Sequence, residues 1–226
     1  MSTARHASAP FTVDLVVLTA LTSELAVLLE KGKGNSGRWT LPWRLPVRSE
    51  SLNAVSGRLA VSAVGSKAAW IEQLGAFGDG RAHPSLVQLS VAFVAAVPHE
   101  MAGPERGFHW FPVRDLPPLA PRHRSMVEAA IERLRMAVDR APIAFRLLPP
   151  RFTLTELQQM YELLLGKRLH KASFRRSLQA ASLVTATDEW RSEGRGRPAQ
   201  LYTFAPKRKN RPARGVRFDL LGGTGV

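Results

Sequence analysis

The stretch FTLTELQQMYELLL, residues 152–165, and the stretch KASFRRSLQAA, residues 171–181, decide the architecture of the C-terminal part of the chain. Apolar residues recur every three or four positions in both stretches, which predicts two amphipathic helices. Thr153 or Thr155 is the predicted cap of the first helix, and Gly166 ends it. Two helices joined by so short a turn predict a helix-turn-helix, whose second helix fits a DNA major groove.

The second predicted helix has a polar and basic outer face. Phe174 and Leu178 form its inner stripe. Positively charged side chains on the opposite face of such a helix are typical of contacts with phosphates and base edges. The residues that we predict to contact DNA from this helix are Lys171, Ser173, Arg175 and Arg176.

A hairpin is predicted to follow the second helix. Residues 183–185 and 200–204 are rich in residues that favour strands, and residues 189–198 between them are polar and rich in Gly and Arg. Two strands joined by such a tip form a wing. We predict that Arg195 and Arg197 contact a minor groove or phosphates from this tip.

The positive charge of the chain is concentrated in this part. The 226 residues carry 32 Lys and Arg against 18 Asp and Glu, a net charge of +14. Residues 143–226 hold 16 of the basic residues and 6 of the acidic ones, so they supply +10 of that charge. Such asymmetry favours double-stranded DNA as the partner, ahead of a membrane surface or a merely well-solvated face.

Composition excludes several classes of protein. The chain has no Cys, which excludes disulfide scaffolds, thiolate metal sites and a cysteine nucleophile. Its six histidines show no metal-ligand spacing, so neither a metal nor another cofactor is predicted. No apolar run approaches the roughly 20 residues that a membrane-spanning helix needs. We therefore expect a cytoplasmic protein without membrane contact.

The N-terminal part has the pattern of a separate α+β domain. Strands are predicted at 12–18, 24–29, 71–77, 87–97 and 108–113, with helices at 51–64 and 122–140. The Pro-containing stretch at 142–150 is the expected junction. The predicted organisation is a disordered N-terminus (1–10), an effector and dimerisation domain (11–142), a winged helix (143–206) and a basic flexible tail (207–226).

Part of this N-terminal domain resembles a Nudix box. Aligned without gaps, the box keeps its first Glu as Glu50, its Arg as Arg58 and its last Gly as Gly65. The remaining glutamates of the box fall on Leu59, Ser62 and Ala63. Mg²⁺ needs hard oxygen ligands such as carboxylates, so the resemblance implies a fold without hydrolytic chemistry and without a catalytic residue.

The order of further motifs along residues 11–205 resembles the Nudix-related transcriptional regulators of NAD metabolism. These motifs include Leu74-Gly-Ala-Phe-Gly-Asp79, Ile143-Ala-Phe-Arg-Leu-Leu-Pro149 and Gly196-Arg-Pro-Ala-Gln-Leu-Tyr202. The resemblance implies an α+β protein in which a Nudix-like mixed α/β/α sandwich precedes a winged helix-turn-helix. It also implies a homodimeric repressor that leaves DNA when ADP-ribose or a related nucleotide binds.

The chain departs from that family at two places. Trp43 and Arg44 replace a Gly-Gly pair, and residues 83–87, His-Pro-Ser-Leu-Val, replace Asp-Pro-Arg-Gly-Arg. Candidate residues for a nucleotide effector are Arg38, Arg48, Arg58 and Phe77. Two alternatives remain open: a divergent nucleotide pyrophosphohydrolase, and a dimeric DNA-binding protein without a ligand.

Overall fold

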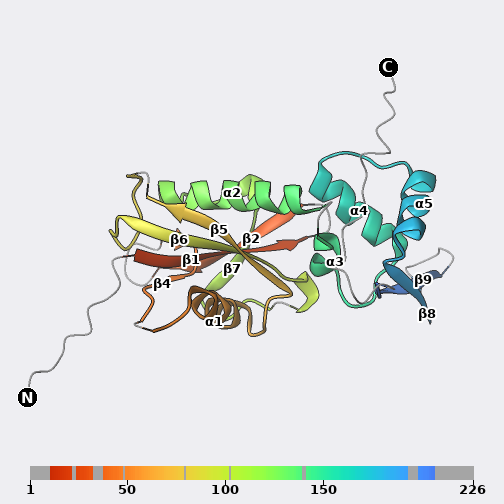
Figure 1. Cartoon of the computed structure of the whole chain (residues 1–226), viewed down its shortest axis with the longest axis horizontal. Coiled ribbons are helices and arrows are strands. Elements are labelled where there is room, and N and C mark those ends of the chain that lie inside the picture. The colour runs from red at the N-terminus through yellow and green to blue at the C-terminus, as the bar shows by residue number, and fades with distance from the viewer. Residues whose placement is uncertain are drawn as a thin grey trace, which may run out of the picture.

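The computed structural model describes residues 11–21, 24–32, 38–47, 49–78, 80–101, 103–138, 141–192 and 198–206. A sheet lies between two helices at one end of the molecule, and a small helical domain with a hairpin lies at the other (Figure 1). The predicted N-terminal segment and the basic tail lie outside the described residues. None of the described helices has the length and apolar character needed to cross a membrane.

The sheet has the mixed topology that the family resemblance implied. Its central strands β1 (Phe11–Ala20) and β6 (Leu89–Ala96) are parallel, and the other pairs are antiparallel. The main path runs β3-β2-β1-β6-β5, with β4 paired to β1 and β7 to β2. The remaining strands are β2 (Leu25–Lys31), β3 (Trp39–Thr40), β4 (Trp43–Arg44), β5 (Trp70–Phe77) and β7 (Phe108–Pro112).

Two helices cover opposite faces of this sheet. Helix α1 (Leu52–Val64) begins where the Ser51 hydroxyl accepts a hydrogen bond from the Ala54 amide, and it ends at Gly65, whose φ of +70° suits glycine. Its apolar side packs on one face of β1 and β6. Helix α2 (Pro121–Ala137) buries Met126, Ala130, Leu134 and Ala137 on the other face. The predicted α/β/α sandwich is therefore confirmed.

Three helices and a hairpin follow. They are α3 (Ile143–Leu147), α4 (Leu154–Leu165), α5 (Lys171–Ala181), β8 (Val184–Arg191) and β9 (Ala199–Phe204). Thr153 caps α4 in a capping box. The Thr153 hydroxyl accepts a hydrogen bond from the Glu156 amide, and the Glu156 carboxylate accepts one from the Thr153 amide. The predicted winged helix-turn-helix is confirmed. Strand β8 is longer than predicted, since it includes Trp190, which the sequence pattern assigned to the tip.

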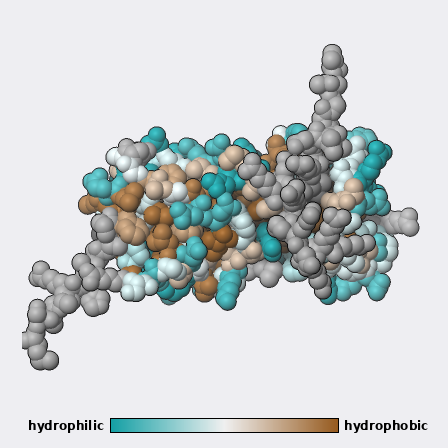
Figure 2. All heavy atoms as spheres, in the orientation of Figure 1, coloured by the Kyte–Doolittle hydropathy of each residue, from teal (hydrophilic) through white to brown (hydrophobic). Residues whose placement is uncertain are grey.

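The sheet and the winged helix share one continuous apolar core. The cluster on the α2 side of the sheet extends through α3 into α4 and α5. Phe145 of α3 lies at the joint, with ring centroids 5.6 Å from Phe152 and 4.6 Å from Phe204. Apolar atoms gather over the sheet on one face of the molecule, while the surface at the α5 end is mostly polar (Figure 2). The surfaces of the two parts therefore differ in character although their interiors are joined.

Candidate nucleic-acid interface

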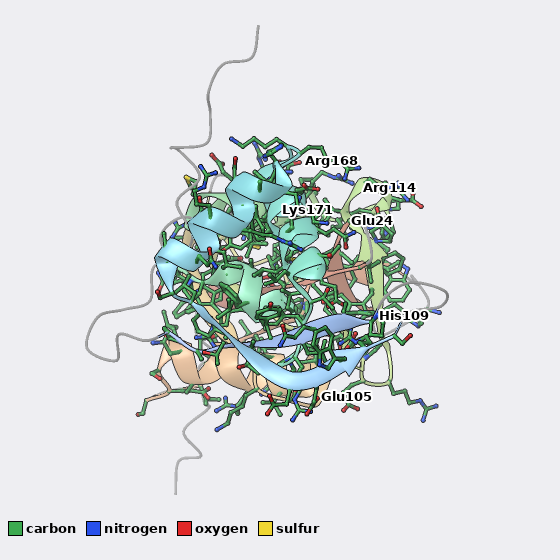
Figure 3. The ribbon with its side chains drawn as sticks, turned by 90° about the vertical axis from the view of Figure 1, so that its right-hand side faces the viewer. Glu24, Glu105, His109, Arg114, Arg168 and Lys171 are labelled. Carbon is green, nitrogen blue, oxygen red and sulfur yellow. The ribbon has the colours of Figure 1, made fainter. Side chains whose placement is uncertain are left out.

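Helix α5 turns a basic face outward. Phe174 and Leu178 are buried against the core, whereas the side chains of Lys171, Arg175 and Arg176 are exposed. Ser173 is half-buried, with its hydroxyl 3.4 Å from Nδ1 of His170. Figure 3 looks onto this end of the molecule, with Lys171 and Arg168 labelled. The four residues predicted to face DNA from this helix thus lie together on one helix.

The turn between α4 and α5 is held by a carboxylate. Glu162 accepts hydrogen bonds from the Leu169 amide (2.9 Å) and from Nε2 of Gln158 (3.0 Å), and it pairs with Arg168 (3.2 Å). Burial raises the pKa of Glu162, but these hydrogen bonds and the Arg168 charge outweigh burial and lower the pKa below its ordinary value. Glu162 is therefore a charged anchor that fixes where α5 begins relative to α4. Sequence analysis did not single it out.

Two ion pairs hold the β8–β9 hairpin against the start of α4. Arg191 of β8 lies 2.6 Å from the Glu156 carboxylate, and its guanidinium also donates to the Arg151 carbonyl at 3.3 Å. Arg151 in turn lies 2.5 Å from the Glu189 carboxylate. The predicted wing residues Arg195 and Arg197 lie outside the described residues. Strand β8, which precedes them in the sequence, is anchored by these contacts.

The positions of the Nudix box, kept and replaced, fall on helix α1 and on the residues next to its two ends. Glu50 and Arg58 form an ion pair with each other. Leu59 and Ala63 are buried in the packing of α1 on the sheet, and the Ser62 hydroxyl donates to the carbonyl of its own helix at 2.9 Å. The helix itself contains no Asp or Glu. It therefore offers no cluster of carboxylates for Mg²⁺.

The structure does not bring the predicted effector-binding residues together. Phe77 packs with the core on the α2 side of the sheet, whereas Arg58 belongs to α1 on the opposite face. Arg38 is exposed just before β3, and Arg48 lies outside the described residues. Phe77 and Arg58 therefore lie on opposite faces of the sheet.

A buried polar cluster that sequence analysis missed joins β1 to the start of α2. Asp14 of β1 lies 2.8 Å from Nε2 of His83 and 3.1 Å from Nε2 of His123, and all three side chains are fully buried. Thr12 donates to the second Asp14 oxygen at 2.7 Å. The buried Arg122 guanidinium donates to Ser90 at 3.3 Å and to a backbone carbonyl at 2.9 Å. We call Thr12, Asp14, His83, Ser90, Arg122 and His123 the buried polar cluster.

The spacing of Asp14, His83 and His123 is compatible with a metal ion, but their hydrogen bonds argue for another role. Nδ1 of His123 accepts the Leu41 amide at 3.1 Å, and Nδ1 of His83 accepts the Ser85 amide at 3.0 Å. A neutral ring whose Nδ1 accepts carries its proton on Nε2. Both Nε2 atoms lie within hydrogen-bond distance of the same Asp14 oxygen, and they are 2.9 Å from each other. Metal-ligating histidines instead donate from their second ring nitrogen. The three side chains therefore act as a hydrogen-bonded clamp.

The pKa values of Asp14 and His123 agree with a charged carboxylate beside a neutral His123 ring. Burial alone would raise the pKa of Asp14, but the hydrogen bonds from His123 and His83 lower it to about 2. Burial lowers the pKa of His123, and this effect exceeds the opposing influence of the Asp14 hydrogen bond and charge. The carboxylate thus stays ionised while the His123 ring stays neutral near neutral pH.

The two segments at which the chain departs from the regulator family, Trp43–Arg44 and residues 83–87, meet at this clamp. Trp43 packs edge-on against His83, with ring centroids 5.3 Å apart. Leu86, which takes the place of a Gly, keeps a left-handed backbone with φ of +63° and is 87% exposed. The loop from 80 to 88 therefore retains a backbone that suits glycine while His83 fastens it to β1.

Comparisons with known proteins agree with this geometry. Residues 144–204 match the NrtR DNA-binding winged helix domain. The ADPR responsive transcriptional repressor NtrR of Acinetobacter baylyi is 29% identical over 205 residues, which cover 86% of this chain and 81% of that protein. A MutT/nudix family protein from Enterococcus faecalis, 20% identical with a TM-score of 0.66 over 91% of this chain and 90% of that one, shares the fold.

Two crystal structures of NrtR from Shewanella oneidensis are more similar. One, complexed with a 27mer DNA, is 31% identical with a TM-score of 0.78, covering 88% of this chain and 94% of that one. The other is 30% identical with a TM-score of 0.79, covering 92% of this chain and 99% of that one. The likeness extends over both the sheet and the winged helix. The chain therefore belongs to the NrtR family of transcriptional regulators, in which a Nudix-like domain precedes a winged helix.

Proposed function

We propose that this protein is a transcriptional repressor that binds double-stranded DNA through α5 and the β8–β9 hairpin. The observation that carries the proposal is the exposed face of Lys171, Arg175 and Arg176 on a helix whose position is fixed by Glu162. The Shewanella relative with the same fold was crystallised with DNA. In this assignment residues 11–142 form the effector domain and residues 143–206 the DNA-binding domain.

The protein acts in this proposal as a homodimer on a palindromic operator in the cytoplasm. A two-fold dimer of winged helices binds two half-sites related by the same symmetry. The regulated genes are those of NAD metabolism or a related pathway. The NtrR relative is a transcriptional repressor, which supports the proposed sign of regulation.

Selection from random duplexes tests the DNA-binding proposal. The full chain is incubated with the library at about physiological salt, where nonspecific binding is typically weak. Enrichment of a palindrome by wild type, and its loss in Arg175→Ala/Arg176→Ala, is the expected result. Lack of enrichment by wild type, with equally weak and salt-sensitive binding in the variant, would remove sequence-specific DNA binding from the proposal.

The Nudix-like domain senses ADP-ribose or a related nucleotide in this proposal and does not hydrolyse it. The responsiveness of the Acinetobacter relative to ADPR supports the choice of ligand. Lack of hydrolysis follows from α1, where Leu59, Ser62 and Ala63 supply no carboxylate and where Glu50 is paired with Arg58. The only retained box carboxylate is thus neutralised by the retained box Arg.

Two measurements with ADP-ribose test the sensor. Thermal unfolding should shift upward with ligand concentration, since a ligand that binds the folded state alone stabilises it. Turnover in the presence of Mg²⁺ should be undetectable. Turnover that disappears in Glu50→Ala would identify a divergent pyrophosphohydrolase instead, and unchanged melting with a panel of nucleotides would identify a dimeric DNA-binding protein without an effector.

A further inference from the structure

The outward face of the β8–β9 hairpin presents a large aromatic side chain. Trp190 is 57% exposed, while Leu201 on the neighbouring strand is buried. It pairs across the hairpin with Gln200 and lies three residues before the tip segment that carries Arg195 and Arg197 in the sequence. An indole left this open to water, close to a basic tip, needs a functional or structural reason.

The neighbours of Trp190 explain why it faces outward. Side chains alternate between the two faces of a strand, so Arg191 lies on the face opposite Trp190. Glu189, within the irregular part of β8, forms its ion pair on the same side as Arg191. Both of them point toward the start of α4, where Glu189 pairs with Arg151 and Arg191 pairs with Glu156. The two ion pairs thus fix the direction of the indole ring on the other face.

A bulge in β8 adds to this fixed geometry. The register shifts between Ala186 and Trp190. Within this bulge the Thr187 hydroxyl donates to the Leu201 carbonyl at 2.9 Å, and the Thr187 carbonyl accepts from Nε2 of Gln200 at 3.2 Å. Because the strand is held on both sides of the bulge, little conformational entropy is lost when Trp190 contacts a partner. The hairpin therefore presents a preorganised aromatic surface.

Charge selects the kind of partner. Residues 143–226 carry a net charge of +10, so a second copy of this surface would be repelled and a polyanion attracted. Of the two acids that precede Trp190, Glu189 is paired with Arg151, and Asp188 is exposed in the bulge. Next to the tip in the sequence, strand β8 therefore exposes the apolar indole ring of Trp190 and no additional basic side chain.

We propose that Trp190 packs against the deoxyribose rings that border the minor groove, next to the major groove that receives α5. The inference rests on the proposed DNA-binding function and adds a contact to it. Apolar contact with sugar releases no counterions, whereas each Arg or Lys contact with a phosphate does. Trp190 therefore adds affinity and orientation without adding to the salt dependence.

The test uses the full-length protein and the duplex that wild type selects from the random library. Trp190→Ala should weaken binding about 5- to 20-fold, the range of a truncated anchor residue, while Trp190→Phe should stay within about threefold of wild type. The slope of log affinity against log salt should not change in either variant. In Arg175→Ala the slope should fall by about one. Met136→Ala, which removes a 54% exposed apolar side chain from α2, is the matched control and should bind like wild type.

Tryptophan fluorescence supplies a second readout that loss of structure alone would not reproduce. Adding DNA should reduce acrylamide quenching of wild type, and this protection should be absent in Trp190→Phe although that variant still binds. Unchanged affinity of Trp190→Ala would overturn the proposal, as would a lower salt slope in it, because the hairpin tip would then have moved. If Trp190→Ala instead abolishes dimerisation, the ring contacts a second copy and the proposal is wrong. If wild type selects no duplex at all, the proposed function fails first and this contact with it.

Discussion

The two parts of the molecule use their polar residues in opposite ways. The sheet domain places Asp14, His83 and His123 at its centre, where each nitrogen or oxygen atom has a partner and water has no access. The winged helix keeps its core apolar and places Lys171, Arg175 and Arg176 outside. We infer that polar residues stabilise the first part and serve recognition in the second. Substitutions that separate stability from DNA affinity can test this difference.

Removal of the central carboxylate should have the largest effect. Asp14→Ala leaves the buried imidazole N–H groups of His83 and His123 and the Thr12 hydroxyl without their acceptor, so the free energy of unfolding should drop by about 3–5 kcal/mol. Denaturant unfolding measures this drop, and Asp115→Ala, an exposed acid in the same domain, is the control, with a change within about 0.5 kcal/mol.

Operator affinity of the folded Asp14→Ala protein should match wild type. Arg175→Ala/Arg176→Ala should show the reverse pattern, with normal stability and weak binding. A loss below about 1 kcal/mol for Asp14→Ala would mean that the buried polar cluster does not stabilise the fold.

Glu162, which holds the turn between α4 and α5, should affect DNA affinity through the structure of that turn. Removing an acid near a DNA-binding surface raises affinity if only its charge matters. If Glu162 positions α5 through its bond to the Leu169 amide, Glu162→Ala should instead lower operator affinity by about tenfold, the equivalent of one charge-assisted hydrogen bond. Fluorescence anisotropy with labelled operator decides between the two signs. Glu128→Ala, on the exposed face of α2, should leave affinity unchanged.

Acid should weaken the sheet domain through the buried His123. The pKa of His123 is lower in the folded protein than its ordinary value of 6.5, so above pH 6.5 neither state gains a proton and the full stability is present. Below pH 6.5 the unfolded chain binds a proton that the folded chain refuses, and stability falls by at most about 1.4 kcal/mol per pH unit. Asp14 adds its own loss only as the pH falls from 3.8 through about 2.

Denaturant unfolding between pH 7.5 and 5 measures the contribution of His123. His123→Gln should flatten the curve, while His109→Gln, which removes an exposed ring, should not. Equal slopes for all three proteins would show that His123 is protonated in the folded state as well.

The smallest effect is expected at the strained loop. Leu86 has φ of +63°, a conformation that costs a leucine about 1–2 kcal/mol, and its side chain is too exposed to be compensated by burial. Leu86→Gly should raise stability by about 0.5 kcal/mol after the larger entropy loss of glycine is included. Leu86→Ala keeps the strain and should match wild type. Destabilisation by Leu86→Gly would show that the leucine side chain makes a stabilising contact.

The sequence by itself determined the elements whose signals are local. The spacing of Phe174 and Leu178 determined the inner face of α5 and therefore its basic outer face. Thr153, one of the two predicted caps, marks the start of α4. The helix predicted at 122–140 followed from apolar periodicity in the same way, whereas the sandwich was implied by the family resemblance. The hairpin was predicted in outline, but strand β8 extends to Arg191 because ion pairs with α4 continue it past the polar residues that indicated a loop.

Only the tertiary structure decided which distant residues meet. Asp14, His83 and His123 are separated by 69 and 40 positions, and no spacing rule connects them, because their meeting depends on the parallel pairing of β1 with β6 and on the docking of α2. The same packing placed Phe77 and Arg58 on opposite faces of the sheet, although the sequence analysis predicted that both contact a nucleotide effector. Local periodicity encodes the face of an element, whereas contacts between elements depend on the topology that joins them.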